Sequence, residues 1–414
     1  MNQPAKDIKE RLTYEANRSA PPEGFPRLPD IPAGRYIDPA FFALEQDTIW
    51  QRSWLFAGHT DELQQVGDYK LWDDAGQPVV ILRDEQGDIR AYYNTCQHRG
   101  APVVAERQGN TKRLKCAYHG WTYALDGELV GVPEQRDFVD LDRSSRNLVS
   151  LRCELWGGWI FVNLDDEAQP LLDYLGNVVP DLAQFDIDSL RFYEKHSISV
   201  AANWKVCLDA FMEVYHLQFI HPETVNELLD YKAAAMGLLE NGHSWMYTRL
   251  RHGPQESVEG VPEIGSVGEL ARMTNMAYSL FPNFVVPLDM TGFPLLIFWP
   301  ESINQTRLDV WWFGPEDGET ARADRVFEDK ARLIEAWRQR LEIFDVVLGE
   351  DTQWLPAVQR SMETPAFSGV PLSYQERRIY HSHEAVDNCI GRERVPSELR
   401  VEPMLAQYLE NSIG

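Results

Sequence analysis

Two short motifs in the first third of the chain place two cysteines and two histidines at spacings that suit a metal centre. They are Cys96-x-His98 and, seventeen residues later, Cys116-x-x-His119. Two thiolates and two imidazoles on separate loops can hold either a tetrahedral zinc ion or a [2Fe–2S] cluster with mixed ligands. Zinc knuckles usually pair two cysteines within a loop, whereas each loop here carries one cysteine and one histidine. The spacing therefore favours an iron–sulfur cluster.

A second candidate metal site follows in the pattern Glu213-x-x-His216-x-x-x-x-His221. Glu213 and His216 are three residues apart and would share one face of a helix. His221 lies about 140° further around a regular helix, so the two imidazoles cannot reach one metal ion from an unbroken helix. Pro222 disfavours the helical conformation at residue 221. We therefore expect the helix to end just before His221.

A third ligand for this site must come from another part of the chain. Two histidines and one carboxylate with open positions form the facial triad of non-heme Fe(II) oxygenases. The best candidate is Asp351, in the pair Glu350-Asp351 at the end of a predicted helix and eight residues before Gln359. A His-x4-His pair alone is weak evidence for a metal, but the preceding cluster motif makes this interpretation the stronger one.

The elements that must position these residues indicate an α+β protein. From Tyr69 to Val162 the chain breaks into short apolar runs separated by turn residues, which predicts a small all-β domain. The second half has helical periodicity over 203–220 and 326–353, with strand-like runs between them. This pattern predicts a catalytic domain with an antiparallel sheet and long helices. The strand-like runs cover residues 245–251, 293–300 and 307–313.

Three segments are expected along the chain. Residues 1–40 are polar and then proline-rich, which predicts an extended N-terminal arm. The all-β cluster domain would follow over 41–170, beginning with a short helical pattern over 39–54. A polar, proline-containing stretch near 165–190 marks the boundary to the catalytic domain over 171–414.

Composition and charge exclude several classes of protein. The chain has 414 residues and a formal net charge of −25, which disfavours nucleic-acid binding. Five cysteines are too few, and odd in number, for a secreted disulfide scaffold. The polar start contains no signal peptide, and the most apolar stretch, Phe281 to Pro300, is interrupted by Asp289. We therefore expect a cytoplasmic protein that does not insert into membranes.

Together the motifs resemble the α subunit of the Rieske non-heme iron oxygenases, the ring-hydroxylating oxygenase family, over residues 40–400. The strings C-x-H-R-G and C-x-Y-H-G-W match the Rieske motif of that family. The resemblance implies a [2Fe–2S] Rieske cluster followed by a mononuclear Fe(II) site. The implied cluster ligands are Cys96, His98, Cys116 and His119, and the implied iron ligands are His216, His221 and Asp351.

The resemblance also implies a role for Glu213 and a set of partners. Glu213 matches the family's bridging carboxylate, which links an iron-ligand histidine, here His216, to a cluster ligand, here His119, of the neighbouring subunit. The implied assembly is a head-to-tail homotrimer, with or without a small β subunit. The chain has no G-x-G dinucleotide fingerprint, so its electrons would come from NAD(P)H through a separate reductase, with or without a ferredoxin. Asp209-Ala210 stands where many members have Glu-Asn, a departure close to the iron.

Three functions are consistent with these patterns. The favoured one is a terminal mono- or dioxygenase that uses O2 to hydroxylate an aromatic or hydrophobic substrate, as in aromatic hydrocarbon catabolism. The first alternative is a monooxygenase that acts on a quaternary amine or methyl ether. Aromatic cages bind such cations, and the chain has 13 Trp, 16 Tyr and an acidic balance. The non-enzyme alternative, a Rieske electron carrier or zinc-stapled binding protein, leaves the second motif unexplained.

Overall fold

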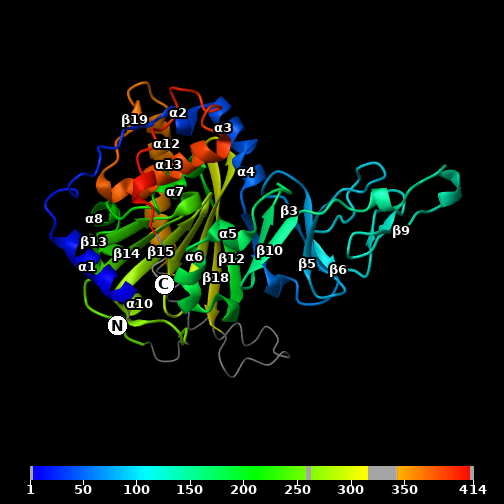
Figure 1. The fold of residues 1–414 in the computed structure, drawn as a ribbon, viewed down its shortest axis with the longest axis horizontal. Helices are drawn as coiled ribbons and strands as arrows, with labels where there is room; N and C mark the ends of the chain where they lie inside the picture. Colours follow the sequence, from blue (N-terminus) through cyan, green and yellow to red (C-terminus); the bar gives the residue numbers. More distant parts are fainter. Residues whose placement is uncertain (1–2, 258–262, 316–341, 343, 411–414) are drawn as a thin grey trace. The chain divides into compact units, whose positions relative to one another are not determined.

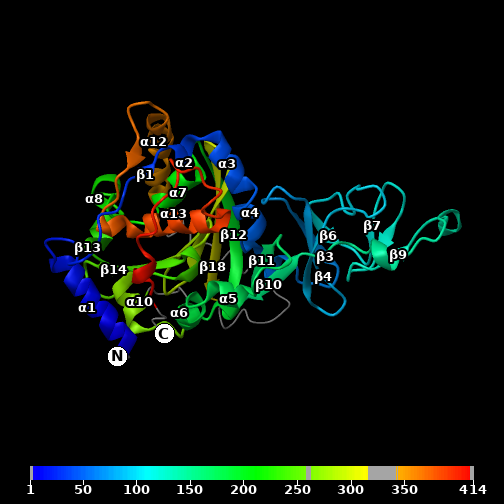
Figure 2. The same cartoon turned by 45° about the horizontal axis from the view of Figure 1, so that its top comes forward.

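The computed structural model describes residues 3–257, 263–315, 342 and 344–410. These residues form two compact units, drawn with all their elements in Figures 1 and 2. One unit comprises residues 50–174, and the other combines residues 1–49 with residues 175–414. The second unit is therefore discontinuous in sequence, because its first part precedes the whole of the other unit.

The unit formed by residues 50–174 is built from short antiparallel strands, as the turn-separated apolar runs predict. Its strands form a four-stranded sheet in the order β5-β4-β3-β6 and two three-stranded sheets, β7-β8-β9 and β10-β11-β2. The strands are β2 (Leu55–His59), β3 (Asp68–Trp72), β4 (Val79–Arg83), β5 (Ile89–Tyr93), β6 (Gln108–Asn110), β7 (Leu114–Lys115), β8 (Thr122–Tyr123), β9 (Leu129–Gly131), β10 (Arg152–Trp156) and β11 (Trp159–Asn163).

The other unit contains a seven-stranded antiparallel sheet in the order β12-β18-β17-β16-β15-β14-β13. This confirms the predicted α+β class and its antiparallel sheet. The strands are β12 (Leu190–Val200), β13 (Leu229–Leu238), β14 (Ser244–Leu250), β15 (Thr274–Leu280), β16 (Phe284–Leu288), β17 (Phe293–Ser302) and β18 (Gln305–Pro315). A separate two-stranded ladder joins β1 (Ile31–Pro32) to β19 (Gly369–Val370).

Helices α7, α12 and α13 gather on one side of the seven-stranded sheet (Figures 1 and 2). An apolar cluster that includes Met236, Met246 and Ala277 packs this side of strands β13 to β15 against Val214 and Leu217. Besides α1 (Gln3–Asn17), the larger helices are α3 (Pro39–Gln46), α7 (Trp204–Asp209), α12 (Leu355–Met362) and α13 (Arg377–Ile390). The shorter ones include α2 (Gly34–Ile37), α4 (Ile49–Arg52), α5 (Leu171–Leu175), α6 (Val178–Leu182), α8 (Leu217–Ile220), α9 (Val225–Leu228) and α10 (Glu269–Met273).

The N-terminal segment differs from the expected extended arm. Residues Gln3–Asn17 form helix α1, which packs against β13, so the prediction of an extended arm is wrong for these residues. The reason is a short apolar stripe: Ile8 and Leu12, one helical turn apart, are both buried. Two isolated apolar residues in a polar stretch are too weak a signal to predict a helix from sequence.

Further along, residues 1–49 supply charged partners to the core of the same unit. Glu45 forms a buried ion pair with Lys205, at 2.7 Å between Oε1 and Nζ. Arg35 pairs with Asp387 at 2.6 Å, and neither side chain is exposed. Because a buried charge without its partner is strongly destabilising, this segment is an integral part of the unit.

The two predicted long helices are shorter or interrupted. The segment 203–220 contains α7 and α8 with a non-helical stretch between them, so the prediction of one continuous helix is wrong there. Of the second predicted helix, 326–353, residues 344–352 are helical, and residues 326–341 and 343 lie outside the described residues. Among the described residues, no helix combines the length and the apolar character that crossing a bilayer requires.

Candidate metal centres

The two loops with the cysteine–histidine motifs have the same pattern of backbone hydrogen bonds. The amide of Gly100 donates to the carbonyl of Cys96, and the amide of Gly120 donates to that of Cys116, both at 2.9 Å. Each cysteine amide then donates to the carbonyl five residues ahead, that of Ala101 or Trp121. Both glycines adopt positive φ, +77° and +73°, which closes each turn at little cost only for glycine. The sequence therefore folds each motif into the same tight loop.

These loops bring the four predicted cluster residues together. The His98 and His119 rings lie with centroids 4.5 Å apart, and both Cys96 and Cys116 are 2% exposed and form no disulfide. His98 Nδ1 is buried, and none of the described residues forms a hydrogen bond with it. An orphaned imidazole nitrogen beside two buried thiols is what a metal ligand requires, so these residues fit a mixed Cys2His2 iron–sulfur cluster.

Aromatic side chains cover one histidine and leave the other accessible. Trp121 stacks on the His98 ring at 4.8 Å, and Phe138 meets that ring edge-on at 5.8 Å. His119 is exposed, and the neighbouring Tyr118 side chain is 59% exposed. Burial and the charges of His119 and Arg99 lower the pKa of His98. His98 therefore lies on the covered side of the site, and His119 lies on the side that faces solvent.

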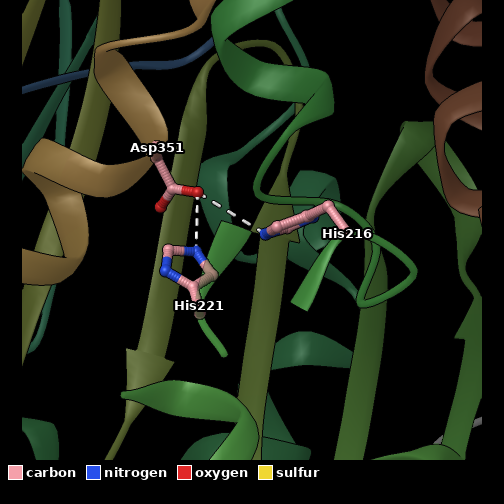
Figure 3. Close-up of side chains that lie close together, drawn as sticks. All are labelled: His216, His221 and Asp351. Carbon is pink, nitrogen blue, oxygen red and sulfur yellow. Dashed lines mark hydrogen bonds and ion pairs between the residues drawn. The ribbon is translucent and has the colours of Figure 1, made fainter. Parts of the chain in front are cut away.

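His216, His221 and Asp351 form the second candidate centre (Figure 3). One ligand atom from each of the three side chains lies within 4.8 Å of the others. Asp351 Oδ1 lies 2.8 Å from His221 Nε2 and 3.5 Å from His216 Nε2. Two imidazole nitrogens and a carboxylate oxygen that converge in this way can hold one divalent metal ion with open positions.

A break in the helix makes this convergence possible. His216 lies directly before α8 and His221 directly after it, so one turn of helix separates the two residues. The backbone of His221, with φ −119° and ψ 42°, has left the helix. This confirms the prediction that the helix ends before His221. Asp351 comes from the helical residues 344–352 and reaches the histidines across 130 positions of sequence.

Two further carboxylates orient the two imidazoles. His216 Nδ1 contacts Glu213 Oε1. On the other histidine, His221 Nδ1 lies 2.7 Å from Glu350 Oε2, which also accepts a hydrogen bond from Thr224 Oγ1 at 2.7 Å. With Nδ1 donating to a carboxylate, each imidazole turns the lone pair of Nε2 toward Asp351. The same tautomer is therefore set on both histidines.

The carboxylates also raise the pKa of both histidines. Burial opposes protonation of His216, but the hydrogen bond to Glu213 and the charges of Glu213 and Asp351 outweigh it and raise its pKa. Burial also lowers the pKa of His221, but the hydrogen bonds and charges of Asp351 and Glu350 outweigh it, so the pKa of His221 is raised. Hydrogen bonds from His221 and Thr224 lower the pKa of Glu350 despite its desolvation. The site therefore concentrates negative charge, which favours a bound cation.

Sequence reasoning assigned no role to Glu350, although it is the residue before Asp351. Its only signal was adjacency, and neighbouring residues in a regular helix point in different directions. Tyr123 was missed as well: its hydroxyl lies 3.3 Å from Cys96 Sγ and accepts from the amide of Gln97 at 2.9 Å. Both contacts depend on tertiary structure that a sequence motif does not encode.

Two family models match this chain. Residues 53–149 match a Rieske [2Fe–2S] domain, and residues 187–392 match the catalytic domain of a ring-hydroxylating α subunit. The matched ranges contain the cluster loops and the three residues of the second centre, respectively.

Among curated proteins, the chain is similar to the glycine betaine monooxygenase oxygenase subunit of Chromohalobacter salexigens. The two are 34% identical over 201 residues, which are 49% of this chain and 45% of that relative. It is also similar to the chloroplastic choline monooxygenase of Spinacia oleracea, with 26% identity over 379 residues, 90% of this chain and 80% of the relative.

The fold is shared with solved structures. Naphthalene 1,2-dioxygenase from Rhodococcus sp. bound to indole aligns with a TM-score of 0.72 and 22% identity, over 95% of this chain and 100% of that one. At this identity the likeness concerns the fold alone. The two consecutive domain matches, together with this fold, show that the chain belongs to the ring-hydroxylating α-subunit family of Rieske non-heme iron oxygenases.

Proposed function

We propose that this protein is the terminal oxygenase of a multicomponent Rieske system and that its substrate is a quaternary amine. The observation that carries the oxygenase activity is the convergence of His216, His221 and Asp351 within 4.8 Å, in a chain that also presents the cluster loops. A carrier protein or a zinc-stapled binding protein would not need this second centre.

In this proposal each centre is held by the residues that the structure brings together. Cys96, Cys116, His98 and His119 bind the [2Fe–2S] cluster, and His216, His221 and Asp351 bind Fe(II). When bound, the cluster supplies one-electron transfer and the iron supplies O2 activation beside the substrate. Glu213 and Glu350 hold the iron-ligand imidazoles in the Nε2-coordinating tautomer.

The assembly proposed is a head-to-tail homotrimer in which the cluster of one copy faces the iron site of the next. Its support is that each of the two units exposes aromatic side chains next to its candidate metal ligands. His119 and Tyr118 are exposed on one unit, with the Arg99 guanidinium 5.4 Å from the Tyr118 ring centroid. On the other unit Tyr215 and Phe219, on either side of His216, are 53% and 71% exposed. Exposed aromatic side chains are enriched at specific protein–protein interfaces.

The relatives favour a quaternary amine over the aromatic substrate that the sequence alone suggested. Glycine betaine and choline, named in the two curated relatives, both carry a trimethylammonium group. The likeness to naphthalene dioxygenase concerns only the fold, and a fold by itself does not determine the substrate. We therefore place the alternative that the sequence left open ahead of ring hydroxylation.

The proposed reaction inserts one oxygen atom of O2 into a C–H bond of the substrate. The other oxygen atom leaves as water after taking up two protons and two electrons. NAD(P)H supplies the two electrons through a separate reductase, with or without a ferredoxin. The expected cytoplasmic location, where NAD(P)H and reduced thiols are available, stays a prediction.

A single turnover of the reduced, iron-loaded protein with ¹⁸O2 tests this function. Glycine betaine, choline, naphthalene and benzoate are offered separately, and products are analysed by mass spectrometry. We expect one ¹⁸O atom in an oxidised amine, or formaldehyde from an N-methyl group, and no oxidation of the aromatic compounds. Ring oxidation without amine oxidation would contradict the substrate class, and a protein without iron and sulfide would contradict the oxygenase itself.

A further inference from the structure

Arg378 is a buried cation that has no anionic partner in the described part of the chain. Its side chain, on helix α13, is fully buried, with 0% relative exposure. Among the described residues, no carboxylate forms an ion pair with it, and burial and the charge of the neighbouring Arg377 lower the pKa of its guanidinium. Buried charges are normally paired, because an uncompensated charge destabilises the folded state. This arginine is therefore unusual within the core of its unit.

The guanidinium also has a donor that is not used. Nε donates to Ser244 Oγ at 2.9 Å, and Nη1 donates to the carbonyl of Met212 at 3.3 Å. Nη2 is buried and has no hydrogen-bond partner among the residues that the structure describes. The adjacent Arg377 differs, because its two terminal nitrogens donate to the carbonyls of Tyr374 and Met236. One arm of Arg378 is thus held in place while the other points at no acceptor.

Both contacts place Arg378 beside the iron-binding segment. Met212 directly precedes Glu213, whose carboxylate orients His216. Ser244 lies two residues from Met246 on β14, so the two side chains share one face of the sheet. Met246 belongs to the apolar cluster with Val214 and Leu217, which flank His216. The guanidinium therefore lies on the side of the sheet that carries the metal ligands.

We propose that Arg378 binds the carboxylate of the substrate, and that the substrate class is a quaternary amine that carries a carboxylate, as a betaine does. This inference rests on the proposed oxidation of a quaternary amine and specifies which kind of amine is used. A carboxylate would accept from Nη2 and neutralise the buried charge in one contact. An amino alcohol such as choline offers only a neutral hydroxyl in the same position.

In this structure Nη2 is closed off from solvent, so a ligand must displace a neighbouring side chain to reach it. Met212 lies directly beside the guanidinium, because its backbone carbonyl accepts the hydrogen bond from Nη1. The driving force is the pairing of a buried charge, which strengthens in a low-dielectric site. The apolar cluster around His216 would accommodate the methyl groups of the ligand.

The test compares glycine betaine with choline, which share a trimethylammonium group and differ in having a carboxylate or a hydroxymethyl group. Binding to the iron-loaded protein is measured by titration calorimetry, and turnover is measured with each substrate. We expect wild type to prefer glycine betaine. We expect Arg378→Met to weaken glycine betaine binding by about 10- to 100-fold while choline binding changes less than about threefold. The control is Arg377→Met on the same helix, which should leave the ratio of the two affinities unchanged.

Each outcome decides one of the two claims. Equal loss for both ligands, no loss for either, or a wild-type preference for choline would overturn the role of Arg378 while amine oxidation stands. Oxidation of neither amine by wild type would instead overturn the proposed function. If Arg378→Met does not fold, Arg378→Lys keeps the charge without the planar fork, and we expect it to reduce the preference for glycine betaine; an unchanged preference would contradict the proposal.

Discussion

The two metal centres of this chain are assembled in opposite ways. The four cluster residues lie within residues 96–119, on two loops with the same hydrogen-bond pattern closed by glycine. The three residues of the second centre come from both sides of a helix break and from a helical segment 130 residues beyond His221. The first site depends on local chain geometry, whereas the second depends on how the sheet and helices pack.

The two units that carry the centres also differ in whether they are formed by one continuous segment or by segments far apart in the sequence. Residues 50–174 are one continuous segment, while the catalytic unit needs residues 1–49 as well as 175–414. Glu45 and Arg35 from the first segment neutralise Lys205 and Asp387 in the second. A local site in a continuous unit should tolerate isolation, and a site that many segments build should not. The following predictions test this contrast, from the largest expected effect to the smallest.

The largest effect is expected when the two units are expressed as separate fragments. We expect residues 50–174 to fold and to show the absorption spectrum of a Rieske cluster. Residues 175–414 should fail to fold, because Lys205 and Asp387 would be buried without their partners, at about 3–5 kcal/mol for each broken pair. Circular dichroism and thermal unfolding measure both. A cooperatively folded 175–414 fragment would show that the N-terminal segment is dispensable.

Replacing Asp351 by Ala removes the ligand contributed by the distant segment. We expect iron content to fall from three to two atoms per chain and turnover to fall by more than about 1000-fold, with the cluster spectrum unchanged. Metal analysis and a turnover assay measure these effects. Gln353→Ala, an exposed position two residues away, is the control and should retain all three irons. Loss of the cluster in D351A would mean that the two centres are not independent.

Replacing Glu213 by Ala should leave metal binding at both centres intact but slow electron transfer between them. Both metal sites should remain loaded, while turnover falls at least about 100-fold because the variant lacks the carboxylate that we propose as the bridge from His216 to the neighbouring subunit. Rapid mixing of the reduced protein with O2 would show slow oxidation of the cluster. Near-normal turnover in this variant would rule out the bridging role.

Replacing Glu350 by Ala addresses the carboxylate that sequence reasoning missed. Without it, Nδ1 of His221 loses its acceptor, and we expect the affinity for the mononuclear iron to fall by about 10- to 100-fold with the cluster unaffected. Thr224→Val, which removes only the hydrogen bond to Glu350, should have a smaller effect in the same direction. Unchanged iron affinity in both variants would mean that Asp351 alone positions His221.

The smallest effect is a difference in pH dependence between the centres. The raised pKa of His216 and His221 means that protons compete with the metal at a higher pH than an ordinary histidine would allow. Affinity for the mononuclear iron should therefore fall as pH falls through the raised pKa, by about tenfold per pH unit for each proton bound. The lowered pKa of His98 predicts that the cluster survives to lower pH. Parallel loss of both centres on acidification would contradict this.

The fold class and both metal motifs could be predicted from the sequence because their signals are local. Alternating apolar runs with turn residues define the strands around the cluster, and Pro222 marks the helix end at His221. Helix α1 could not be predicted, because its burial depends on β13. The long predicted helix over 203–220 failed for a similar reason: periodicity indicates a helix but does not reveal where tertiary contacts interrupt it.

By itself the sequence determined which residue types were available at which spacing, and this was enough to name the cluster loops, the histidine pair and Asp351 as the best candidate for the third ligand. Only the tertiary structure decided that Asp351 meets both histidines, that Glu350 orients one of them, and that Arg378 is buried with no counter-ion among the described residues. The physical reason is that short-range geometry follows from backbone preferences and hydrogen bonds between near neighbours. Contacts across more than a hundred residues depend on how the whole sheet and its helices pack.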